Sequence, residues 1–117
     1  MVVEADTAAR WWAQQFADGT DPMRSADIPP PTSQQVATFL DTLRDGLLAA
    51  MTGPPTTHTL GVDYDPDPLL ADALRAAGAT PPFTIQLPIK TLMWIEPGHI
   101  RVRRGETGPI HEIPLHE

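Results

Sequence analysis

The sequence has no cysteine and only two serines, so several kinds of catalytic group are missing. Without cysteine there is no disulfide, no thiolate zinc site and no cysteine nucleophile. Ser25 and Ser33 stand outside a G-x-S-x-G motif, which excludes the nucleophile elbow of serine hydrolases. Lys90, the only lysine, follows Leu-Pro-Ile and not a glycine-rich loop, so a phosphate-binding loop is excluded. We therefore assign no catalytic residue.

A membrane span and a signal peptide are also missing from the sequence. No apolar run approaches the roughly 20 residues that a helix needs to cross a bilayer. The N-terminal stretch MVVEADTAAR carries acidic residues where a signal peptide carries basic ones. These features predict a soluble, cytoplasmic protein that does not bind membranes. The 117 residues, of which 41% are hydrophobic, are enough to bury one core, so we expect a single domain over residues 1–117.

Negative charge outweighs positive charge, and the net charge is −7. Residues 1–72 carry eleven acidic side chains and three arginines, a net charge of −8, whereas residues 73–117 have a net charge of +1. A negative field repels the phosphates of nucleic acids and attracts basic surfaces. An acidic surface usually serves solubility alone. As a functional surface, it predicts a protein partner of basic character, or self-association in which the acidic half of one copy meets the other half of the next.

Proline is abundant and marks the borders of the secondary structure. The 14 prolines fall mostly in clusters, and helix interiors and central strands exclude such clusters. Between the clusters, apolar residues recur at helical spacing or alternate as in half-buried strands. The expected elements are helices over 4–18, 32–51 and 68–77 and strands over 57–64, 83–87, 91–95, 99–103 and 110–113.

This order of elements predicts an α+β fold. The sequence α-α-β-α-β-β-β, with one further strand at the end, implies a mostly antiparallel sheet of four or five strands with helices on one face. Thr32 and Gln35 fit a capping box at the start of the second helix. Pro97 and Gly98 fit a type II turn, which predicts a hairpin. Residues 1–31, a helix and a proline-rich connector, pack on the domain or form an arm that packs on a partner.

Trp11 is the residue that fits its helix least well. Trp12 continues the apolar stripe, whereas Trp11 points about 100° away, toward polar residues. Such a tryptophan either folds over the rim of the domain or anchors a partner, because tryptophan is enriched in binding hot spots. On the second interpretation, the contact surface consists of Trp11, Gln14, Gln15 and Asp18.

A second set of candidate contact residues lies on the strand over 99–103. His99, Arg101 and Arg103 occupy alternate positions, so they share one face of the strand. Such a face is usually the solvated side of a hairpin; as a site, it is a strip that binds carboxylates or other anions. Lys90, set where two apolar strands meet, is a further candidate for anion binding.

The three aspartates of VDYDPDPLL, residues 62–70, allow two interpretations. Proline drives the preceding residue out of the helical conformation, so Asp67 becomes the N-cap of a helix that begins at Pro68. Alternatively, an extended segment aims the carboxylates to one side, where a divalent cation binds. The candidate metal ligands are Asp63, Asp65, Asp67 and His58. Capping is favoured, because proline and leucine stand at the glycine and glutamate positions of an EF-hand loop.

The sequence as a whole favours a small, acidic, non-enzymatic protein-binding module: a subunit, an adaptor or an inhibitor without a cofactor. No pattern gathers reactive side chains at one point. Two alternatives stay open. The first is an enzyme or ligand-binding domain that holds a divalent cation or an anion with Asp63, Asp65, His58 and Lys90. The second is a structural accessory protein of a phage or mobile element.

Overall fold

The computed structural model describes residues 2–18, 30–51, 57–62, 66–79, 87, 90–105 and 107–115. The elements are α1 (Val2–Asp18), α2 (Ser33–Ala50), β1 (His58–Val62), α3 (Pro68–Ala76), β2 (Thr91–Glu96), β3 (His99–Arg104) and β4 (Ile110–Ile113). This order confirms the predicted α+β fold. Of the predicted strand over 83–87, only Leu87 lies within the described residues; it is buried and occupies a bend.

The four strands form one sheet in the order β1-β2-β3-β4, and every neighbouring pair is antiparallel. The predicted hairpin joins β2 to β3, where Glu96 pairs with His99. Gly98 in the connecting turn has a φ of 80°, the conformation that the third position of a type II turn requires and that glycine adopts most readily. Sequential strands are therefore neighbours throughout the sheet.

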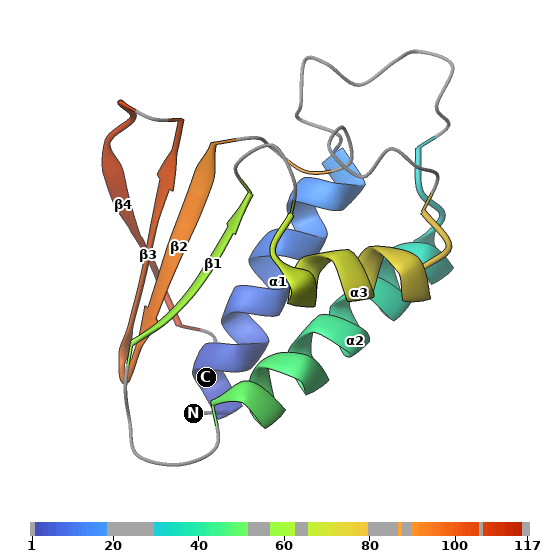
Figure 1. Ribbon diagram of the computed structural model, residues 1–117, viewed down its shortest axis with the longest axis horizontal. Coiled ribbons are helices and arrows are strands. Elements are labelled where there is room, and N and C mark those ends of the chain that lie inside the picture. Colours follow the sequence, from blue (N-terminus) through green and yellow to red (C-terminus); the bar gives the residue numbers. More distant parts are fainter. Residues whose placement is uncertain are drawn as a thin grey trace.

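The helices cover one face of the sheet, and Figure 1 shows the two layers side by side. α1 lies between the sheet and α2, with contacts to β2, β3 and α2. α2 also packs against α3. Within the described part of the chain, no helix covers the other face of the sheet (Figure 1).

The core lies between the two layers. The sheet supplies alternate residues of its strands, among them Leu60, Met93 and Ile100, which are fully buried. In the helical layer, the rings of Phe16 and Phe39 stack with a centroid distance of 5.0 Å and an interplanar angle of 29°. Each fully buried side chain of this size contributes roughly 1.5–3 kcal/mol to stability, so this core fixes α1 and α2 to each other and to the sheet.

Two local features set the ends and the packing of α2. The predicted capping box is confirmed: the Gln35 N–H donates to Thr32 Oγ1 at 3.1 Å, and the Thr32 N–H donates to Gln35 Oε1 at 2.9 Å. At Gly46, an added Cβ would lie 3.1 Å from Leu69 Cδ2. The absence of a side chain at Gly46 therefore lets α3 approach α2 closely.

Candidate functional site

The outer face of the sheet, defined as the face turned away from the helices, is left uncovered by the helices of the described part of the chain (Figure 1). Residues on the strands alternate between the buried and the outer face, and paired residues of neighbouring strands share a face. The outer face carries Thr59, Gly61, Leu92, Trp94, Glu96, His99, Arg101, Arg103, Ile110 and Glu112.

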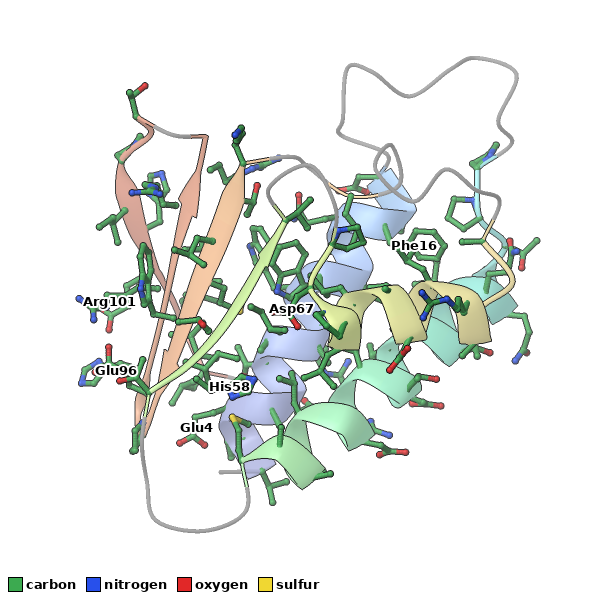
Figure 2. All side chains as sticks on the ribbon, viewed as in Figure 1. Glu4, Phe16, His58, Asp67, Glu96 and Arg101 are labelled. Carbon is green, nitrogen blue, oxygen red and sulfur yellow. The ribbon has the colours of Figure 1, made fainter. Side chains whose placement is uncertain are left out.

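One end of the outer face is a charged cluster of four side chains from β2, β3 and β4. His99 Nδ1 lies 2.8 Å from Glu112 Oε1, and Arg101 forms a short ion pair with Glu96. The four residues line an open depression of about 350 Å³. Figure 2 shows Glu96 and Arg101 on the side of the sheet opposite the helices. Each basic residue of the cluster therefore has a carboxylate beside it.

The other end of the outer face is apolar apart from one arginine. Leu92, Arg103 and Ile110 lie side by side in register on three strands. The guanidinium carbon of Arg103 lies 5.9 Å from the centroid of the Trp94 ring, within the range of a cation–π contact. Ile110 is 56% exposed. This end combines apolar surface with a single positive charge.

His99, Arg101 and Arg103 thus lie on one face of β3, as predicted, but each has a different neighbour. The three residues do share the outer face, with Ile100 and Val102 buried behind them. His99 and Arg101 contact carboxylates, whereas Arg103 contacts Trp94. A uniform basic strip is therefore absent.

The surface predicted around Trp11 differs in part from the expectation. Trp11 is half-buried, packs against the core and meets Trp12 edge-on, with ring centroids 4.9 Å apart. Gln14 is exposed and donates a hydrogen bond to Asp18 Oδ1 at 2.7 Å. Gln15 is only 7% exposed, so the prediction that it lies on a free polar face is wrong. The cause is that α1 packs against α2 and the sheet together, which buries more than one stripe.

The aspartate segment is described only in part, because Asp63 and Asp65 lie outside the described residues. Asp67 is the N-cap of α3, as predicted: its Oδ1 accepts a hydrogen bond from the Leu69 N–H at 3.3 Å, and Pro68 opens the helix. His58 begins β1 and points toward the helical layer (Figure 2). Among the described residues, no three His, Asp or Glu side chains gather as metal ligands.

Lys90 precedes β2 in an unusual backbone conformation. Its φ is 58°, the only positive value among the described residues that are not glycine. Its carbonyl oxygen accepts a hydrogen bond from the Gly105 N–H at 2.8 Å, which closes the end of the β2–β3 hairpin. The backbone of Lys90 therefore has a structural role, and its predicted role in anion binding stays a prediction.

Trp94, Leu92 and Ile110 are surface residues that were not among the candidates predicted from the sequence. The stretch TLMWI predicts an apolar strand, but its apolar residues do not by themselves indicate which positions face the helices. Leu92 and Trp94 alternate with Met93 and Ile95, so β2 carries apolar residues on its outer as well as its inner face. This pattern was a usable signal, since an antiparallel sheet with one solvated face normally alternates apolar with polar residues.

Comparison with known proteins identifies the fold. No protein-family model and no curated protein matches the chain, and none of the described helices is long and apolar enough to cross a membrane. Among solved structures, the chain is similar to the BTG/Tob domain of FOG-3 from C. elegans, with a TM-score of 0.69 and 18% sequence identity. The similarity covers 100% of this chain and 92% of that one. At this identity, the likeness establishes a shared fold.

Proposed function

We propose that this protein is a small, non-enzymatic protein-binding module whose contact surface is the outer face of the sheet, centred on Trp94. The observation that carries the proposal is the uncovered apolar end of this face. Leu92 and Trp94 are half-buried there and Ile110 is 56% exposed, although each would be stabilised by burial against a partner.

The composition of the outer face supports a protein partner. Protein interfaces combine an apolar centre rich in tryptophan and arginine with a polar, solvated rim. Trp94 and Arg103 occupy the apolar end, and the charged cluster of Glu96, His99, Arg101 and Glu112 borders it. The cluster then acts as a rim that fixes the orientation of the partner.

The same cluster is a poor candidate for catalysis. Its side chains are 65% (His99), 62% (Glu112), 49% (Arg101) and 32% (Glu96) exposed. Electrostatic catalysis depends on a water-excluded site in which charges act strongly, and water at these exposures weakens them. The exposure of the cluster therefore favours binding over chemistry.

We also propose where the protein acts and what kind of partner it binds. We expect it to act in the cytoplasm on a protein and not on nucleic acid or a membrane, because the net charge is −7 and the sequence offers no membrane-binding segment. Trp11, with Gln14 and Asp18, is a second proposed contact surface. This second surface is less favoured than the one centred on Trp94, because Trp11 already packs against the core.

Site-specific photo-cross-linking tests the proposal. Benzoyl-phenylalanine is placed at Ile110 on the outer face and, as a matched control, at Ala37, which is exposed on α2. In the cells that naturally express the protein, we expect a discrete adduct from position 110 and none from position 37. Trp94→Ala should lower the yield of the adduct more than about tenfold, as loss of a hot-spot residue does.

Two results would contradict the proposed surface. One is an adduct that forms only from position 37, on the helical side. The other is an adduct from position 110 whose yield is unchanged by Trp94→Ala. An adduct with the mass of two copies of the chain identifies the partner as the protein itself, and a larger or smaller adduct identifies a different protein.

A further inference from the structure

Among the described residues, Arg103 differs from the other charged side chains of the outer face in having no carboxylate paired with it. Arg101 is paired with Glu96, and His99 with Glu112. Within the described part of the chain, Arg103 makes no ion pair, and its Nε atom is buried without a hydrogen-bond partner. Its guanidinium makes a cation–π contact with Trp94. A charged donor group is therefore held in place without its usual acceptor.

The surroundings of Arg103 strengthen any interaction that it makes. Leu92 and Ile110 flank it in register, and Trp94 lies diagonally across the β2–β3 pair. Arg103 is half-buried, so its guanidinium is partly removed from water. A carboxylate that approaches a partly desolvated guanidinium forms a stronger, often bidentate pair than it forms with a fully hydrated one. Contacts within the fold also hold the side chain in position before a ligand arrives.

We propose that Arg103 is the specificity-determining residue of this surface and that it binds an Asp or Glu side chain of the partner protein. Apolar residues that flank this acid in the partner pack against Trp94 and Ile110. The inference rests on the proposed function, since it names the chemistry of the partner at the same surface. It assigns the partner a local motif of one acidic residue between apolar ones.

This acidic motif differs from the basic partner that the net charge of −7 suggests. The net charge acts over long distances, whereas Arg103 acts on a side chain in contact with it. At physiological salt, charges on the surface are screened beyond about 8 Å. A carboxylate in contact with Arg103 is within hydrogen-bond range of the guanidinium, whereas the helices lie on the opposite face of the sheet (Figure 1). Direct contact then decides which side chain binds at Arg103, and the overall field affects only the approach.

Titration with short peptides tests the assignment at the residue itself. The probes are acetyl-Leu-Glu-Leu-amide and its Gln and Lys analogues, and the readouts are the NMR signals of the Arg103 Nε–H and the Trp94 indole N–H. We expect the Glu peptide to shift both signals and to bind at least about fivefold more tightly than the Gln peptide, the size expected for one partly exposed ion pair. The Lys peptide should bind least tightly.

Two variants show whether the preference depends on Arg103. In Arg103→Gln, the Glu and Gln peptides should bind equally, with the dispersed amide spectrum of the folded protein unchanged. Arg75→Gln, which removes the same charge from an exposed site on α3, should keep the fivefold preference. The assignment is overturned if the preference survives in Arg103→Gln, if the Lys peptide binds as tightly as the Glu peptide, or if the Glu peptide leaves the Arg103 signal unshifted at millimolar concentration.

The two proposals fail separately. If the peptide titration overturns the role of Arg103 while cross-links at position 110 still depend on Trp94, the protein-binding surface stands and only the acidic motif is lost. If the cross-links do not depend on Trp94, the surface itself is wrong.

Discussion

The carboxylate of Glu4 accepts a hydrogen bond from the backbone N–H of Gly98, with a distance of 3.1 Å between Oε2 and N. The two residues are 94 positions apart in the sequence, and the bond ties the first turn of α1 to the β2–β3 turn. The same turn separates Glu96 from His99, which belong to the charged cluster of the outer face. The position of the cluster relative to the helical layer therefore depends in part on this bond.

Removal of this bond should destabilise the protein slightly. We expect Glu4→Ala to lower the free energy of unfolding by about 1 kcal/mol, the usual net value of one hydrogen bond. Glu4→Gln, which keeps a carbonyl acceptor, should lose less. Urea denaturation of the two variants measures the difference. Equal losses in the two variants would show that the bond does not contribute to stability.

Gly108 is required by the shape of the β3–β4 connection. A Cβ at this position would lie 1.9 Å from the carbonyl oxygen of Arg104, too close for any real contact. Gly108→Ala should therefore displace the connection, cost about 2–3 kcal/mol and increase hydrogen exchange in β4. The matched control is Gly98→Ala: Gly98 has a φ of 80° but no atom within 4 Å of an added Cβ, and the expected cost is only about 1–2 kcal/mol for the left-handed backbone. Similar costs for both variants would contradict the steric explanation.

The fold was predictable because its signals are local. The capping box of Thr32 and Gln35, the turn at Gly98 and the alternation of apolar and polar residues along β1 and β3 each involve residues close in sequence. Proline clusters separated these segments, so even the order of the elements could be derived. Of the strand order, only the pairing of β2 with β3 was predicted, from the short turn between them. The position of β1 beside β2 was not predicted, because α3 separates the two strands in the sequence.

The site was less predictable because it depends on contacts across the sheet. His99, Arg101 and Arg103 are equivalent in the sequence pattern, and only the pairing of β3 with β2 and β4 gives each a different neighbour. The burial of Gln15 follows from the packing of α1 between two layers, which the period of a single helix does not reveal. The neighbours of the three basic residues follow from the strand register, and the burial of Gln15 follows from the order of the layers.

Asp67 tests whether the aspartate segment acts as a cap or as a metal site. As the N-cap of α3, it accepts the Leu69 N–H, so Asp67→Ala should cost about 1 kcal/mol and Asp67→Asn nearly nothing. Thermal melting should show the same cost in EDTA and with added magnesium or calcium. A cost that appears only with a cation, together with a cation-induced rise of the wild-type melting temperature, would instead support the metal interpretation.

Trp11 and Trp94 should respond in opposite ways to replacement by alanine. Trp11 packs against the core and meets Trp12 edge-on, so Trp11→Ala should lose more stability than Trp94→Ala, by about 1–2 kcal/mol. Trp94 lies on the outer face, so Trp94→Ala should mainly lower the yield of partner cross-linking at position 110. Denaturation curves and cross-linking yields for both variants separate the two effects. If Trp11→Ala instead abolishes cross-linking while stability is unchanged, the contact centre is on α1, and the rim of the helical layer replaces the outer face as the binding surface.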